Sequence, residues 1–128
     1  MFDYTVVTDK EFDQIVLDLK SALSERKFGV LWELDLPAKL KEKGVDYVGK
    51  IRILEVCNPQ RAKGVLETNI RAGYFLPCKI VVYEENGKTK IGMPKPTKLI
   101  ELLGDVRLKQ EAAEVEADLM AAIDVTAT

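Results

Sequence analysis

The sequence has 128 residues, of which 47% are hydrophobic and 31% are charged. This length suits one domain over residues 1–128, with a core large enough to fold without disulfides or structural metal. The formal net charge of −2, from 19 basic and 21 acidic residues, gives no electrostatic case for binding nucleic acid. Since there is neither a secretory signal pattern nor an apolar stretch near the ~20 residues that span a bilayer, we expect a cytoplasmic protein with no membrane partner.

The first predicted elements are a strand over residues 3–7 and an amphipathic helix that follows it. Thr8 and Glu11 have the T-x-x-E spacing of a capping box at the start of this helix. Apolar residues then recur at intervals of three and four, as they do on the buried face of a helix. Gly29 is expected to end the helix in the left-handed conformation.

The middle of the chain alternates short strands with short helices. We expect a strand over residues 30–34, a helix over residues 36–43, and a longer strand over residues 47–57. Asn58 is a favourable N-cap, and Pro59 is tolerated at the first position of a helix. The Asn-Pro step therefore predicts that a third helix begins at the end of that strand.

A hairpin is the clearest signal in the second half of the chain. Residues 74–84 are rich in β-forming residues, and Asn86-Gly87 suits a type I′ turn before a returning strand over residues 88–93. A short helical segment is expected over residues 97–103.

The last predicted element is an amphipathic helix over residues 107–124, followed by a tail, 125–128, that we expect to fray. The two long helices each need an apolar surface to cover, and the hairpin requires antiparallel pairing. A two-layer α+β sandwich satisfies both demands, with a mainly antiparallel sheet and the long helices on one face.

The candidate chemistry of the chain rests on its two cysteines. The sequence contains no histidine, which removes the commonest general base and every zinc site that uses histidine. In a reducing cytosol, Cys57 and Cys78 are expected to be free thiols. Strand alternation places Glu55 on the same face as Cys57, together with isoleucines that we expect to point inward. If the two cysteine-bearing strands pair antiparallel, Cys57 and Cys78 become neighbours at one end of the sheet.

The surroundings predicted for Cys57 favour its ionised form. It precedes a helix N-terminus, and Arg61, Lys63 and Lys79 add positive charge nearby. The alternative is that both thiols are inert, because free cysteine is among the most buried residue types and packs as a small hydrophobe. Two thiols are an incomplete zinc site, and Glu55 raises the number of ligands only to three.

Several segments resemble one family of bacterial and archaeal proteins. These are EVCNP (55–59), AKGVL (62–66), LPCKIVVYEENGKT (76–89) and the closing helix. The family is catalogued as domain of unknown function 302. The resemblance implies a β-α-β(4)-α order similar to the TATA-box-binding-protein-like fold, and it implies no reaction. It draws attention to the residues that align with the family's motifs: Glu55, Cys57, Asn58, Pro59, Pro77 and Cys78.

Three functions stay open at this point. The first is a binding domain for a small molecule or a soft metal ion such as Cu(I), for which Cys57 and Cys78 would supply a linear pair of thiolates. The second is an interaction module that forms a homodimer through a sheet edge or the open sheet face, with Trp32, Tyr74 and Phe75 as contacts. Core packing is nevertheless the favoured interpretation of Trp32. The third is a thiol-based redox enzyme or switch that uses the same two cysteines.

Overall fold

The computed structural model describes all residues from 1 to 128, and its centre is one antiparallel sheet of five strands. Along the sheet the strands follow the order β1-β5-β4-β3-β2, so that β1 and β2 form the two edges. The strands are β1 (Asp3–Thr8), β2 (Gly29–Asp35), β3 (Ile51–Cys57), β4 (Cys78–Glu85) and β5 (Lys88–Pro94).

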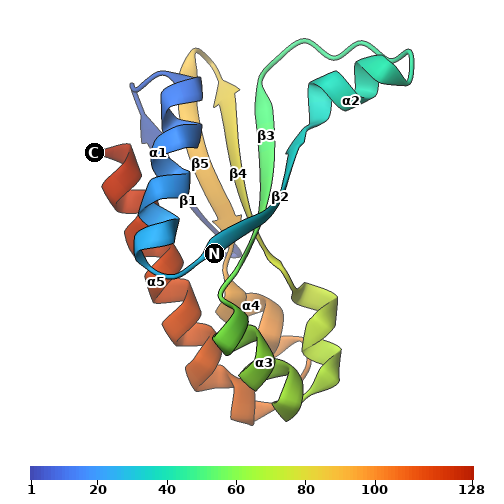
Figure 1. The fold of residues 1–128 in the computed structure, drawn as a ribbon, viewed down its shortest axis with the longest axis vertical. Helices are drawn as coiled ribbons and strands as arrows, with labels where there is room; N and C mark the ends of the chain where they lie inside the picture. The colour runs from blue at the N-terminus through green and yellow to red at the C-terminus, as the bar shows by residue number, and fades with distance from the viewer.

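Two long helices, α1 (Phe12–Glu25) and α5 (Lys109–Ala127), lie side by side on one face of the sheet (Figure 1). The chain is therefore a two-layer α+β sandwich with the β-α-β(4)-α order, which confirms the predicted fold class. α3 and α4 lie together at one end of the sheet, whereas α2 lies at the opposite end (Figure 1). The shorter elements are α2 (Leu36–Glu42), α3 (Pro59–Thr68), α4 (Pro96–Glu101) and the 3-10 helices η1 (Ile70–Phe75) and η2 (Val106–Leu108).

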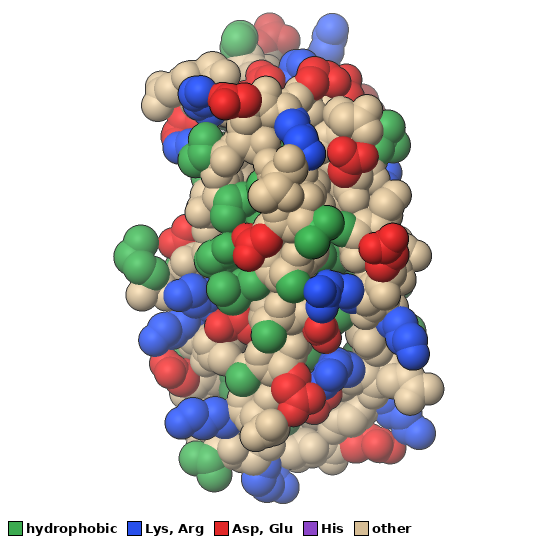
Figure 2. All heavy atoms as spheres, turned by 90° about the vertical axis from the view of Figure 1, so that its left-hand side faces the viewer, with side chains coloured by type: hydrophobic (Ala, Val, Ile, Leu, Met, Phe, Trp, Pro, Cys, Tyr) green, Lys and Arg blue, Asp and Glu red, His purple; other side chains and the backbone are tan.

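The core fills the space between the sheet and the two long helices. Leu54, Ile80 and Ile91, from the three central strands, are completely buried there against helix residues such as Leu19 and Leu119. Figure 2 shows the side of the molecule on which the long helices lie: acidic and basic side chains are interspersed over it, with hydrophobic groups between them. None of the helices is long and apolar enough to cross a membrane.

The start of α1 and the end of α5 differ from the prediction, because β1 is tied to α5 by hydrogen bonds. Thr8 is a buried strand residue whose hydroxyl donates a hydrogen bond to the Ala127 carbonyl (3.1 Å), so it does not cap α1. Glu11 is the N-cap of α1 instead, and its carboxylate accepts from the Asp13 amide (3.2 Å). The predicted capping box is therefore wrong. The predicted fraying of the tail is also wrong, because α5 continues to Ala127 and Thr126 is only 2% exposed.

The predicted turns are partly confirmed. Asn86 (φ 55°) and Gly87 (φ 77°) both adopt the positive φ that a type I′ turn requires. The left-handed residue after α1 is Lys27 (φ 65°), however, and Gly29 already begins β2.

Trp32 is 54% exposed, so its interpretation as a core residue is wrong. It pairs with Glu55 across β2 and β3, so strand alternation turns it toward the sheet face that carries no helices. The chain brings no helix to that face, and the indole stays uncovered.

Candidate functional site

The two cysteines lie where the paired strands β3 and β4 meet at one end of the sheet. In the antiparallel register Val56 is opposite Cys78 and Glu55 is opposite Lys79, so Cys57 lies one residue beyond the pair that contains Cys78. The two residues therefore lie close together at a shared sheet end, as expected for antiparallel pairing of these strands. Both side chains contact one small cavity of about 40 Å³ beside the start of α3.

The two cysteines lie on opposite faces of the sheet, so the prediction that both point inward is wrong. Leu54 and Val56 are the completely buried residues of β3, so the face that carries Ile53, Glu55 and Cys57 is the open one. Cys78 belongs to the opposite face, which packs against the helices. Both faces of β3 are apolar in sequence, and the position of the long helices decides which face is buried.

The surroundings of the two thiols raise their pKa values, which is the opposite of the predicted effect on Cys57. Burial raises the pKa of Cys57, and burial, with smaller contributions from Cys57 and Glu55, raises the pKa of Cys78 to about 11. Two of the three positive charges expected to favour ionisation have carboxylate partners: Arg61 pairs with Glu111 (3.1 Å) and Lys79 faces Glu55. Neither cysteine forms a disulfide.

The other predicted site residues do not all lie at one place: one borders the small cavity, one borders no cavity and one lines a second cavity. Asn58 caps α3, since its side-chain oxygen accepts from the Arg61 amide (3.3 Å), and Asn58 also contacts the small cavity beside Cys57. Pro59 is the first residue of α3 and is exposed, so it borders neither cavity. Pro77 precedes β4 and, like Glu55 and Cys78, lines a second and much larger cavity.

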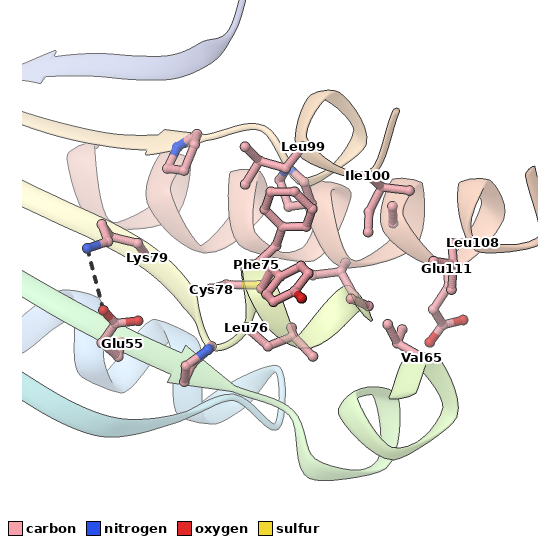
Figure 3. Close-up of a pocket in the computed structure, with 17 residues that line it drawn as sticks. Glu55, Val65, Phe75, Leu76, Cys78, Lys79, Leu99, Ile100, Leu108 and Glu111 are labelled. Atoms are coloured by element: carbon pink, nitrogen blue, oxygen red, sulfur yellow. Dashed lines mark ion pairs between the residues drawn. The ribbon is translucent and has the colours of Figure 1, made fainter. Parts of the chain in front are cut away.

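This larger cavity, of about 320 Å³, lies where β4 begins and is enclosed by η1, α4 and the first half of α5. Of its 17 lining residues, 11 are hydrophobic. Figure 3 shows the Phe75 ring next to Leu99, with Ile100 further along the cavity. The cavity reaches around the end of the sheet, because its lining combines Cys78 from the helix face with Lys79 from the open face.

The charged groups of the cavity are all paired. Glu55 and Lys79 form an ion pair at 3.5 Å, and Glu111 bonds to Arg61, which it shares with Glu114 (3.0 Å). Glu55 and Lys79 lie at one end of the cavity and Glu111 at the other (Figure 3). The cavity therefore offers polar groups at its two ends and an apolar middle.

Hydrogen bonds between elements hold the cavity walls in place. The amide and hydroxyl of Thr97 in α4 both donate to the Glu116 carboxylate of α5, at 3.0 and 2.7 Å. The Asn69 amide donates to Asp105 (3.1 Å), which links η1 to η2. The Asp105 carboxyl also accepts hydrogen bonds from Arg107, and these are the main reason that its pKa lies well below its usual range.

Sequence reasoning missed the walls that come from α4 and α5. Leu99, Ile100 and Leu108 belong to segments predicted as helical, but local patterns carry no information about how those segments dock against η1. The apolar residues between Pro96 and Gly104 were the available signal of a buried helix face. No group of three or more Cys, Asp or Glu side chains is arranged to hold a metal ion.

Comparisons with known proteins agree with the fold and name no activity. The family model described as "Domain of unknown function DUF302" matches residues 4–126. The chain is also similar to a solved structure, the crystal structure of an uncharacterized conserved protein DUF302 from Bacillus stearothermophilus. The two share 48% sequence identity with a TM-score of 0.95, over 100% of this chain and 99% of that one. No protein with a curated description matches this sequence.

Proposed function

This chain belongs to the DUF302 family, and from that premise we propose that it is a binding domain for a small, largely apolar molecule. The ligand occupies the cavity between η1, α4 and α5, with Cys78 at the inner wall. One observation carries the proposal: a cavity of about 320 Å³ lined mainly by hydrophobic side chains, with only a few polar groups. Binding sites for small molecules commonly have this composition.

The size of the cavity is sufficient for useful affinity. A ligand that buried ~200 Å² of apolar surface would gain about 5 kcal/mol from the hydrophobic effect, at ~25 cal/mol per Å². Part of this gain is offset by lost translational and rotational freedom, so a dissociation constant of about 0.2 mM or weaker is expected. Because the walls are tied by the Thr97–Glu116 and Asn69–Asp105 hydrogen bonds, little further ordering is needed on binding.

Protonated thiols favour this function over the two that depend on thiol chemistry. The thiolate is both the metal ligand and the nucleophile, and the pKa values of Cys57 and Cys78 are raised. In the proposed function Cys78 acts as a small apolar wall residue. A Cu(I) site and a redox pair therefore rank below the binding of an apolar molecule.

A direct test uses N-phenyl-1-naphthylamine, an uncharged dye that fluoresces in apolar surroundings. We expect saturable binding to the wild-type protein. Ala112→Leu puts a larger side chain into the cavity and should weaken dye binding at least tenfold, because Ala112 is a buried wall residue. Ala113→Leu is the matched control, because Ala113, the next residue of α5, is exposed and lines no cavity. No saturable binding, or equal loss in both variants, would contradict the proposal.

A homodimer through the open sheet face is a second candidate function, favoured by the exposure of Trp32 on a face that also carries the half-buried Ile53 and Val81. Large exposed apolar side chains that lie together often mark interaction sites. Sedimentation equilibrium of the wild type and of Trp32→Lys tests this candidate. A wild-type monomer at all concentrations would remove it, and would leave the cavity proposal unaffected.

A further inference from the structure

We propose that the cavity selects uncharged ligands, namely apolar molecules that carry one polar head group able both to donate and to accept hydrogen bonds, such as a primary amide. This inference rests on the proposed function and specifies its ligand class. It excludes free fatty acids, alkylamines and metal cations as preferred ligands.

The first argument is the charge balance of the lining. Its ionised groups are Glu55, Lys79 and Glu111, and each has a partner of opposite charge: Glu55 with Lys79, and Glu111 with Arg61. The Cys78 thiol adds no charge, because burial raises its pKa to about 11. A ligand with a net charge would therefore find no free counterion in the cavity.

The second argument is what a charged ligand would have to disrupt. A carboxylate could recruit Lys79 only by weakening its attraction to Glu55, whose side chain is 17% exposed. An ammonium group could bind Glu55 only by weakening the attraction between Glu55 and Lys79. A partly buried charge without a partner is unfavourable, so either event reduces the net gain of binding.

The third argument is that the Glu55–Lys79 pair retains capacity for hydrogen bonds. Its separation of 3.5 Å exceeds the about 2.7–2.9 Å of a good charge-assisted hydrogen bond. The ammonium group has three donors and the carboxylate has two acceptor oxygens. A neutral amide satisfies both, because its carbonyl accepts from Lys79 while its NH₂ group donates to Glu55.

The position of this pair fits a head-group site. Figure 3 shows Glu55 and Lys79 at the same end of the cavity as Cys78, while the apolar wall of Phe75, Leu99 and Ile100 extends away from them. The Lys79 side chain is 47% exposed, so this end is open to solvent. A ligand can place its apolar part in the middle of the cavity and leave its head group between the two charges.

Three probes of one shape test the inference: 2-naphthamide, 2-naphthoate and protonated 2-naphthylmethylamine. Dissociation constants are measured at neutral pH by displacement of N-phenyl-1-naphthylamine from the wild-type protein. We expect the amide to bind at least tenfold more tightly than either charged probe. A carboxylate or ammonium probe that binds as tightly as the amide overturns the inference, whereas dye binding would still support the proposed function.

Two single variants of the same pair then identify the residues responsible. Glu55→Gln leaves Lys79 unpaired, so the affinity for naphthoate should increase at least fivefold relative to the affinity for the ammonium probe. Lys79→Gln leaves Glu55 unpaired and should reverse that preference. Lys88→Gln is the matched control, because it breaks an ion pair with Asp9 (2.5 Å) that borders no part of the cavity.

The outcomes separate the two proposals. If the dye and all probes fail to bind, both the proposed function and this inference are wrong. If Glu55→Gln and Lys79→Gln change the charge preference no more than Lys88→Gln does, the head group does not lie at this pair, and the inference is overturned. The ranking of the probes on the wild type does not depend on how well any variant folds.

Discussion

Two hollows of similar volume lie at opposite ends of the sheet, and they differ in chemistry. The cavity beside α4 has about 320 Å³ and hydrophobic walls, whereas the cleft beside α2 has about 340 Å³ and only 4 hydrophobic residues among the 12 that line it. Lys41, Lys50 and Asp46 are among the charged groups of the cleft. Volume alone therefore does not identify a binding site in this protein.

The difference between the two hollows shows what the cavity offers to a ligand. Water solvates the charged groups of the cleft well, so a ligand that enters must replace that hydration group by group. In the cavity the charges are paired at the ends and the middle is apolar, so a ligand gains from the release of water. The following experiments test this contrast, from the largest expected effect to the smallest.

Truncation of a cavity wall should have the largest effect on stability. Leu108 is 2% exposed, and Leu108→Ala should lower the free energy of unfolding by about 2–5 kcal/mol, because it removes buried methyl groups and leaves a void. Urea denaturation measures the change. In the cleft, Lys41→Ala should change stability by less than about 0.5 kcal/mol. Equal effects at both ends would contradict the contrast.

Alkaline pH should destabilise the cavity end through Cys78. Its pKa is raised from 9.0 to about 11 in the folded state, so the folded protein holds this proton more tightly than the unfolded chain does. The resulting stabilisation is fully present below pH 9.0 and is lost between there and pH of about 11. At about 1.4 kcal/mol per pKa unit it amounts to roughly 2–3 kcal/mol.

The measurement compares wild type with Cys78→Ala by urea denaturation across that pH range. Stability of the wild type should fall more steeply than that of the variant, and Cys57→Ala is the control, with a smaller difference expected. Parallel pH profiles for wild type and Cys78→Ala would show that the Cys78 thiol is not desolvated in the native state.

Loss of the link between α4 and α5 should have an intermediate effect. The N-cap residue of α4 makes no side-chain capping bond, and Glu116 from α5 accepts from the Thr97 amide instead. Glu116→Ala should therefore cost about 1–2 kcal/mol. Hydrogen exchange should accelerate in α4 and stay unchanged in α2. Equal protection of α4 in both proteins would contradict this role.

The smallest effect is expected for Cu(I). With both thiols protonated, reduced wild-type protein should bind Cu(I) less than tenfold more tightly than a variant carrying Cys57→Ser and Cys78→Ser. A competition titration with a Cu(I) chelator gives the ratio. A much larger ratio would establish the soft-metal function that we rank lower.

The sequence was sufficient to predict the fold because its signals are local. The apolar periodicity of the long helices, the Asn86-Gly87 turn and the Asn58-Pro59 helix start each depend on a few neighbouring residues, and all three appear in the structure. The pairing of β3 with β4 was only a condition of the sequence analysis, because it joins strands separated by α3 and η1, and the structure shows that the condition holds.

The candidate site could be predicted only in part because it depends on long-range packing. Ile53 and Leu54 are equally apolar, so alternation in β3 could not show which face meets the helices. The pKa values of the thiols depend mainly on burial by segments far along the chain, and Arg61, which was expected to act on Cys57, pairs with Glu111, 50 residues away. Glu55, Pro77 and Cys78 were found, while the walls from α4 and α5 were not.

The junction between β1 and the last turn of α5 has a consequence for proteolysis. Thr8 and Lys10 donate hydrogen bonds to the carbonyls of Ala127 and Thr126 (3.1 and 3.3 Å). In a chain that ends at Thr128, a carboxypeptidase must first release these residues from Thr8 and Lys10. Digestion should therefore stall after very few residues, and trimming beyond Thr126 should loosen the edge of the sheet rather than shorten a free tail.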